Sequence, residues 1–412
     1  MGTRKRSGCC SCAETEANRH GPHIIPNGFR VLFLNPAFNP QHTSEAPSRR
    51  ALAFHKRLPQ YRATPLHTLD ALAQALGVQK VWLKDESDRL GLPAFKILGA
   101  SWATYCALRD RFPEVNDEWE SVEELAKRLH AYDLPALYAA TDGNHGRAVA
   151  HVAATLGLHA RIYVPQGTAP ARITAIEREG ASAEVVEGTY DDAVLKAARD
   201  ADEQHGLLIQ DNGWSGYEMI PRYVIEGYST MLWEIDDELA ARGEALPTHV
   251  FVQIGVGSFA DAVVRHWSQK LPRAVIIGVE PEDAACALES VRAGKIVRVP
   301  GPHTSIMAGM NCDSPSSVSF PVLQEGVRWF LTIDNDRAIE AMRLLAGLGI
   351  VSGETGAAGL GALLERAAAS SHHARLEMGL DQRSRVLLFS TEGATNPEFY
   401  RSVISGESIN KY

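Results

Sequence analysis

The chain has 412 residues, of which 45% are hydrophobic and 22% charged, and its formal net charge is −9. This length suits two domains, or one large α/β unit with insertions. The acidic balance argues against a nucleic-acid-binding surface, which needs a basic stripe, and no apolar run approaches the ~20 residues that cross a bilayer. The N-terminus also lacks the apolar core of a secretory signal. We therefore expect a cytoplasmic protein without a nucleic-acid or membrane partner.

The six cysteines fall into a polar N-terminal group, Cys9, Cys10 and Cys12, and three isolated positions, Cys106, Cys286 and Cys312. This pattern is neither a disulfide framework nor the paired spacing of a structural zinc site, so we predict no metal. Residues 1–25 are mostly polar and basic, which predicts a disordered tail.

The first predicted elements are a helical segment over 49–57, a short helix ending at Gly77, a strand at Val81 and an alanine-rich helix from Ile97. Farther along, short apolar runs alternate with amphipathic stretches. The strand-like runs are 137–140, 160–164, 183–186, 207–209, 249–254, 275–279 and 386–389, and the helix-like stretches include 146–156, 170–179 and 191–204. Apolar strands joined by helices predict an α/β fold with parallel sheets covered on both faces.

Polar clusters follow several of these strands directly, at 141–147, 210–216, 255–260 and 390–396. In open parallel sheets, ligands bind at the carboxyl ends of the strands. The positions of these clusters are therefore the first indication of a functional site.

Lys96 lies at a junction between a loop and a helix, with Phe95 before it and Ile97 after it. A lysine held against apolar neighbours loses hydration, which lowers its pKa and frees the amine to act as a nucleophile or base. The alternative is a surface lysine whose stem covers Phe95, because charged side chains are mostly exposed.

Residues 255–260 read Gly-Val-Gly-Ser-Phe-Ala, after an apolar strand and at the start of a helix. Glycines let the backbone approach an anion, and a helix N-terminus offers free amides and a positive dipole. This predicts a phosphate site formed by Gly255, Val256, Gly257, Ser258 and Phe259. The same pattern fits the G-x-G-x-x-A dinucleotide fingerprint, with Glu280 as the ribose-binding acid, or a glycine turn for close packing.

A third cluster places Asp142, Asn144 and His145 beside two glycines, so that three polar groups can converge on one ligand. Taken singly, Asp142 could cap the following helix and His145 could be a structural histidine. The compactness of the cluster favours a site.

With Lys96, these loops resemble the fold type II pyridoxal-phosphate enzymes, and most closely the diaminopropionate ammonia-lyases. The resemblance runs from about Arg62 to the C-terminus and is carried, in the family's order, by 84–87 (Lys-Asp-Glu-Ser), 95–99 (Phe-Lys-Ile-Leu-Gly), 141–147 (Thr-Asp-Gly-Asn-His-Gly-Arg), 210–217, 306–312, 352–359 and 390–393. The string at 142–147 is the most specific, because related serine and threonine dehydratases usually carry Ser in place of Asp142. At 394–396 the chain departs from the family, with Ala-Thr-Asn where Asp-Thr-Asp is usual.

The resemblance implies two domains, each with a largely parallel sheet flanked by helices. A large domain that binds pyridoxal phosphate would comprise residues 26–100 and 212–412, and a small domain residues 101–211. It also implies a homodimer.

The resemblance further implies roles for individual side chains. Lys96 would hold pyridoxal phosphate covalently and move protons at the substrate Cα, while Asp142 and Asp211 would pair with the substrate β-ammonium and His145 would assist. The cofactor would be held by Asn144 at its 3′-oxygen, by residues 255–259 at its phosphate, and by Thr391, or its neighbour Ser390, at its ring nitrogen. Glu354, in a glycine-rich loop, would line the same pocket, or alternatively would only help to form the turn.

The implied activity is deamination of 2,3-diaminopropionate, a small amino acid, to pyruvate and two ammonia molecules. A related alternative is a serine/threonine dehydratase-like lyase acting on another β-substituted amino acid. An NAD-dependent oxidoreductase using 255–260 and Glu280 is the alternative from another class, and a catalytically inactive binding homologue is a third. The oxidoreductase explains neither Lys96 nor the 142–147 string, and the intact Lys96, Asp142 and Asp211 argue against the inactive homologue.

Overall fold

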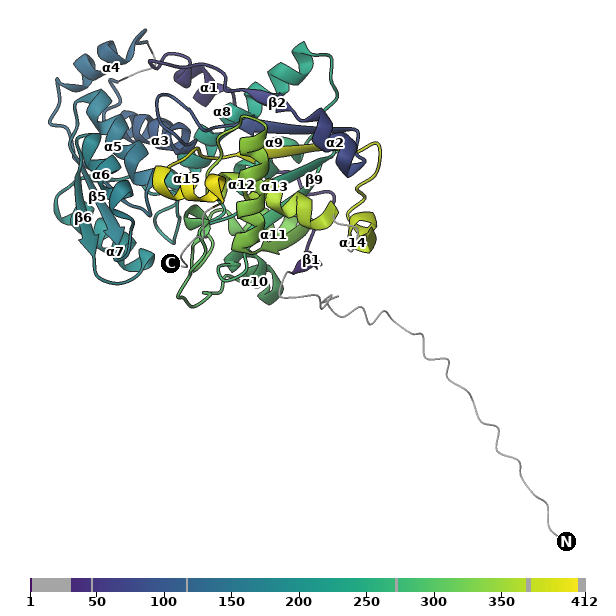
Figure 1. Cartoon of the computed structure of the whole chain (residues 1–412). Coiled ribbons are helices and arrows are strands. Elements are labelled where there is room, and N and C mark those ends of the chain that lie inside the picture. Colours follow the sequence, from purple (N-terminus) through teal and green to yellow (C-terminus); the bar gives the residue numbers. More distant parts are fainter. Residues whose placement is uncertain (2–30, 46, 116–117, 271–272, 368–371, 407–412) are drawn as a thin grey trace.

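The computed structural model describes residues 1, 31–45, 47–115, 118–270, 273–367 and 372–406. The predicted tail of residues 1–25, with its three cysteines, lies outside these ranges apart from Met1. The described chain forms two sheets flanked by helices, which confirms the predicted α/β class (Figure 1).

The larger sheet has seven strands in the order β1-β10-β9-β8-β11-β3-β2, and its five inner strands run parallel. The short edge strands β1 and β2 pair antiparallel. These two strands and β10 were not predicted. The strands are β1 (Leu32–Leu34), β2 (Leu66–Thr68), β3 (Lys80–Asp85), β8 (His249–Gln253), β9 (Val275–Pro281), β10 (Trp329–Ile333) and β11 (Arg385–Ser390). Every residue of β8 and β10 is buried, as expected for parallel strands covered on both faces.

The smaller sheet has four parallel strands in the order β6-β5-β4-β7. They are β4 (Leu137–Ala140), β5 (Ala160–Pro165), β6 (Ser182–Val186) and β7 (Leu207–Leu208), each within two residues of its predicted run. This sheet is built from one continuous segment, whereas the larger sheet takes strands from both sides of it in the sequence. The exact domain boundaries stay a prediction.

Helices connect the strands and cover the sheets (Figure 1). They are α1 (Arg50–His55), α2 (Asp70–Leu76), α3 (Lys96–Arg111), α4 (Val122–Leu129), α5 (Asn144–Leu156), α6 (Pro170–Arg178), α7 (Tyr190–Glu203), α8 (Met219–Ala241), α9 (Ser258–Trp267), α10 (Cys286–Ala293), the 3-10 turn η1 (Ala308–Met310), α11 (Phe320–Gly326), α12 (Asn335–Gly347), α13 (Glu354–Ala367), α14 (His372–Glu377) and α15 (Pro397–Ser405). The predicted end of α2 is confirmed: Gly77 adopts φ 60°, the left-handed conformation that closes a helix.

The helix that begins at Lys96 is held by a close crossing of two glycines. A Cβ atom on Gly227 of α8 would lie 2.8 Å from the Cα of Gly99 on α3, so only glycine allows these backbones to approach this closely. The first turn of α3, with Lys96, is thereby fixed against the long helix α8.

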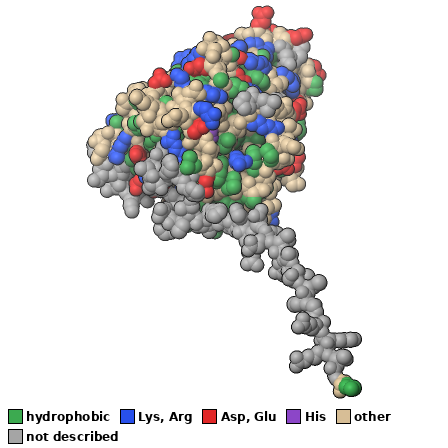
Figure 2. Space-filling view, turned by 90° about the vertical axis from the view of Figure 1, so that its right-hand side faces the viewer, with side chains coloured by type: hydrophobic (Ala, Val, Ile, Leu, Met, Phe, Trp, Pro, Cys, Tyr) green, Lys and Arg blue, Asp and Glu red, His purple; other side chains and the backbone are tan. Residues whose placement is uncertain are grey.

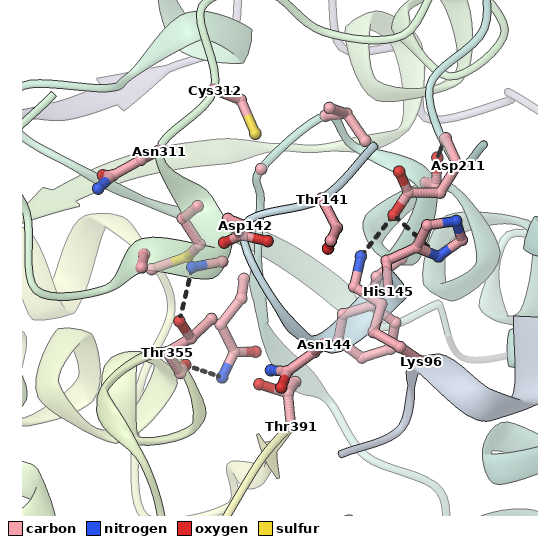
Figure 3. A pocket seen from close by; sticks show the side chains of 18 of the residues that line it. Lys96, Thr141, Asp142, Asn144, His145, Asp211, Asn311, Cys312, Thr355 and Thr391 are labelled. Atoms are coloured by element: carbon pink, nitrogen blue, oxygen red, sulfur yellow. Dashed lines mark hydrogen bonds and ion pairs between the residues drawn. The ribbon is translucent and has the colours of Figure 1, made fainter. Parts of the chain in front are cut away.

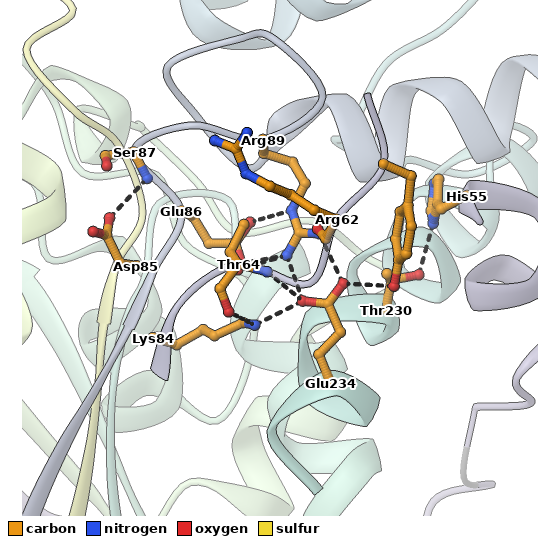
Figure 4. A network of polar contacts seen from close by, with 11 residues as sticks. His55, Arg62, Thr64, Lys84, Asp85, Glu86, Ser87, Arg89, Thr230 and Glu234 are labelled. Carbon is orange, nitrogen blue, oxygen red and sulfur yellow. Dashed lines mark hydrogen bonds and ion pairs between the residues drawn. The ribbon is translucent and has the colours of Figure 1, made fainter. Parts of the chain in front are cut away.

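A buried ionic network braces the same region (Figure 4). Lys84 Nζ donates to Glu234 Oε2 at 2.6 Å. Arg89 Nη2 donates to Glu234 Oε2 at 2.7 Å and to Glu86 Oε1 at 2.6 Å. The network thus pairs two cations with two carboxylates, and paired charges are the form in which buried charge is tolerated. The Lys-Asp-Glu-Ser segment at 84–87 therefore serves the scaffold of β3 through Lys84 and Glu86.

On the face drawn in Figure 2, Lys and Arg side chains are interspersed with Asp and Glu side chains among the coloured atoms. Across the described residues, we find no helix with the length and apolar character needed to cross a membrane.

The glycine crossing makes a testable prediction for stability. Gly227→Ala should lower the free energy of unfolding by about 1–3 kcal/mol, because the added methyl group forces α3 and α8 apart. Gly347→Ala is the matched control, since a Cβ there meets no atom within 4 Å and alanine is the better helix former. Chemical denaturation of both variants checks this, and equal stability of Gly227→Ala and the natural protein would contradict it.

Candidate active site

One pocket lies where the predicted polar clusters meet, at the carboxyl ends of β4, β8 and β11 (Figure 3). Its lining comprises Phe95, Lys96, Thr141, Asp142, Asn144, His145, Tyr190, Asp211, Gln253, Gly255, Val256, Gly257, Ser258, Phe259, residues 308–312, Thr355, Thr391 and Glu392. Every predicted site residue except Glu354 and Ser390 is among them. The pocket therefore draws on both sheets.

Lys96 and Asp211 form an ion pair inside the pocket. Lys96 Nζ donates to Asp211 Oδ2 at 2.6 Å, across 115 residues of sequence, and the two side chains are 21% and 5% exposed. Burial lowers the pKa of Lys96, but the charges of Asp211, Tyr228 and Asp142 outweigh it and raise that pKa above its ordinary value. The predicted lowering of the Lys96 pKa by apolar neighbours is therefore wrong for this state of the site.

The same contact acts on Asp211. Burial alone raises the pKa of Asp211, yet the positive charge of Lys96 and its hydrogen bond lower it to about 2. His145 Nε2 lies 2.8 Å from the carbonyl oxygen of Ile209, which can only accept, so Nε2 carries the proton. His145 Nδ1 then faces Asp211 Oδ2 at 3.9 Å, and burial lowers the pKa of His145. A neutral imidazole thus stands beside the ion pair.

Asp142 lies in the turn that leads from β4 into α5. The N-cap residue of α5 is Gly143, at φ 152°, and no side chain caps this helix, so Asp142 is not the predicted alternative cap. Thr141 Oγ1 accepts a hydrogen bond from the Gly143 amide at 2.9 Å, which shapes the turn. Asp142 therefore lines the pocket with Lys96 and Asp211.

The 255–259 loop forms a cradle that excludes side chains. Gly257 adopts φ 98°, and a Cβ on Gly255 would lie 2.8 Å from the carbonyl oxygen of Gly309. Helix α9 begins at Ser258, so its first amides point into the pocket with the positive end of the helix dipole. This geometry suits a phosphate group.

The two candidate hydroxyls at the end of β11 have different surroundings. Ser390 Oγ donates to Ser352 Oγ at 2.8 Å and does not line the pocket. Thr391 Oγ1 lines the pocket and is buried without a hydrogen-bond partner among the described residues. An unsatisfied buried hydroxyl is costly unless a ligand completes it, so Thr391 and the glycine cradle together fit an aromatic, phosphorylated cofactor such as pyridoxal phosphate.

Glu392 is a pocket residue that sequence reasoning missed. Its carboxylate accepts hydrogen bonds from Asn144 Nδ2 and, at 3.1 Å, from the Thr355 amide. Glu354 does not line this pocket but an adjoining cavity, and burial together with Glu392 raises its pKa to about 7. The signals in the sequence were its place in the polar cluster at 390–396 and in the family string at 390–393.

Glu280 does not have the geometry of a ribose-binding acid. Its buried carboxylate accepts hydrogen bonds from the amides of Ala287, at 2.8 Å, and Leu288, at 2.9 Å, and so anchors the first turn of α10. The NAD-dependent alternative is therefore left without a ribose-binding acid.

Comparisons with known proteins agree with this geometry. The family model for pyridoxal-phosphate dependent enzymes matches residues 57–377. The diaminopropionate ammonia-lyase of Salmonella typhimurium is 38% identical over 366 residues, which cover 86% of this chain and 90% of that protein. Two crystal structures of the Escherichia coli diaminopropionate ammonia-lyase, the selenomethionine holo form and a complex with D-serine, superpose with TM-scores of 0.85 and 0.84 at 35% and 34% identity, each covering 91% of this chain and 96% of the other. This chain therefore belongs to the pyridoxal-phosphate-dependent enzymes, within the diaminopropionate ammonia-lyase family.

Proposed function

We propose that this protein catalyses the elimination and deamination of 2,3-diaminopropionate with pyridoxal phosphate as cofactor. One water molecule is consumed, and pyruvate and two ammonia molecules are released. The observation that carries the proposal is the presence of two carboxylates, Asp142 and Asp211, beside Lys96 in one pocket. The substrate offers two amino groups, and an anionic wall can pair with the second of them.

Four features would hold the cofactor. Lys96 would bind it covalently, the glycine cradle and the first amides of α9 would hold its phosphate, Thr391 would meet its ring nitrogen, and Asn144 its 3′-oxygen. When bound, pyridoxal phosphate supplies an electron sink that makes the substrate Cα proton acidic. The Thr391 hydroxyl is neutral and leaves the ring nitrogen largely unprotonated, which suits elimination.

Whenever Lys96 is not attached to the cofactor, its pairing with Asp211 would couple substrate binding to the release of a base. While Asp211 accepts from the Lys96 ammonium, that amine cannot take up a proton. When the β-ammonium of the substrate approaches Asp211, it competes with Lys96 for the carboxylate. The pKa of Lys96 then falls, and its neutral amine is free to move the proton at Cα.

Asp142 would serve as the second acid or base at Cα, acting on one enantiomer while Lys96 acts on the other. His145, neutral and 3.9 Å from Asp211, would assist proton transfer to the departing amine. The rival substrate is serine or another amino acid with a neutral β-substituent, which would leave the charge of Asp142 unpaired. The dimeric state and the cytoplasmic location stay predictions.

Lys96→Ala tests the central residue. It should abolish the visible absorption band of the covalently bound cofactor and lower ammonia release by a factor of about 100 or more. Lys127→Ala, which removes an exposed lysine on α4, should retain both. Ammonia release at the natural rate from the Lys96→Ala protein would contradict the assigned role.

Asp142→Asn tests the choice of enantiomer. Loss of the carboxylate should reduce kcat/KM for one enantiomer of diaminopropionate about tenfold more than for the other, because only one presents its Cα proton to Asp142. Steady-state assays of both enantiomers on the same preparation provide the internal control. An equal loss for both, or none, would leave Asp142 as a structural residue.

Thr391→Val tests which hydroxyl meets the cofactor. Removing an unpartnered hydroxyl that the cofactor completes should weaken retention of pyridoxal phosphate several-fold, corresponding to about 0.5–1.5 kcal/mol for one hydrogen bond. Ser390→Ala is the matched control and should leave retention unchanged. Equilibrium dialysis of the cofactor measures both, and the reverse ranking would transfer the role to Ser390.

A further inference from the structure

Arg172, on helix α6, lines a second cavity beside the active site. This outer cavity has a volume of about 800 Å³ and shares Asp142 and Tyr190 with the inner pocket. Arg172 and Glu354 also line it. Asp142 therefore lines both cavities, and Arg172 of the outer cavity contacts the loop that carries it.

Arg172 holds the backbone of the Asp142 loop in two ways. Its Nη1 donates to the carbonyl oxygen of Asp142 at 3.2 Å. Its Cδ lies 3.0 Å from the position that a Cβ on Gly143 would occupy, so the arginine stem packs directly over this glycine. The guanidinium and the stem together fix the turn that presents Asp142 to the pocket.

Arg172 is also the main positive charge that acts on Asp142. Burial and the negative charge of Asp211 raise the pKa of Asp142. The positive charges of Arg172 and Lys96 lower it, and the effect of Arg172 is the larger of the two. The other ionisable groups that interact with Asp142 are His145, Tyr190, Cys312 and Glu392. Without Arg172, Lys96 would be the principal cation left, and it is already paired with Asp211.

The charge of Arg172 is shared among three carboxylates, because it also lowers the pKa values of Glu354 and Glu392 against the effect of burial. Since Glu354 has a pKa of about 7, it is protonated about half the time at neutral pH. Burial raises the pKa of each of the three carboxyl groups, and the guanidinium of Arg172 opposes this rise at all three.

We propose that Arg172 is a positioning residue that sets specificity for a cationic β-substituent: it fixes the Asp142 turn and supplies the countercharge that keeps the carboxylate anionic until the substrate ammonium arrives. This inference rests on the proposed function. A neutral β-hydroxyl forms no ion pair with Asp142, so the loss of Arg172 should weaken the binding of diaminopropionate more than that of a substrate with a neutral β-substituent.

The test compares Arg172→Gln, which removes the charge, with Arg172→Lys, which keeps it. Arg178→Gln on the same helix is the matched control, because Arg178 is exposed and does not line either cavity. In the Gln variant, the acid limb of the pH profile of kcat/KM for diaminopropionate should move to higher pH by about one unit. This equals an about tenfold loss of kcat/KM on the acid side, and kcat/KM should recover at high pH. The Lys variant and the control should keep the natural limb.

A second readout does not depend on turnover. In a Lys96→Ala background, calorimetric titration with diaminopropionate should show about tenfold weaker binding at acid pH when Arg172→Gln is added, and little change at high pH. In an Asp142→Asn background the same substitution should shift nothing further, because the group that Arg172 supports is then absent.

Two outcomes would overturn the inference. One is an unmoved acid limb in Arg172→Gln. The other is an equal loss of kcat/KM at every pH, which would mean that Arg172 either binds the substrate carboxylate directly or only stabilises the fold. Thermal melting of the variant would distinguish these two explanations. If instead the natural protein fails to turn over diaminopropionate at all, the proposed function fails first, and that result is distinct from both.

Discussion

The ion pair between Lys96 and Asp211 is the contact on which the site depends. Lys96 opens α3, which follows β3 of the larger sheet, and Asp211 follows β7 of the smaller one, yet their side chains meet at 2.6 Å. Ser258 Oγ also donates to the Asp211 carbonyl at 2.6 Å, which ties the phosphate-cradle loop to the same point. A partly buried lysine and a buried aspartate tolerate each other because each neutralises the other's desolvated charge.

The scaffold behind this pair is arranged to limit its movement. The glycine crossing between Gly99 and Gly227 brings α3 onto α8, and Glu234, on the same helix α8, binds Lys84 of β3 and Arg89. Helix α8 therefore contacts both the helix that carries Lys96 and the strand that precedes it. Catalytic geometry at Lys96 requires this rigidity, because small displacements of a reacting amine cost large factors in rate.

Local patterns made much of the fold and most of the pocket predictable. Apolar runs such as 137–140 and 249–254 form strands because burial on both faces selects them, and polar residues at their ends meet because parallel strands share one edge. Strand β10 is an apolar run that the sequence analysis overlooked. The other failures are non-local. Strands β1 and β2 have three residues each and exist through pairing with distant strands, and the sign of the Lys96 pKa shift depends on a carboxylate 115 residues away. The placement of Glu392 and the binding of Glu280 to α10 likewise appear only in three dimensions.

The most direct test of the central claim is to locate the covalent attachment of the cofactor. The purified protein is reduced with borohydride, digested and mapped by mass spectrometry. The proposed chemistry requires a pyridoxyl group on the peptide that contains Lys96, and on no other lysine in stoichiometric amount. Stoichiometric labelling elsewhere, for instance at Lys84, or no labelling of a fully loaded protein, would contradict it.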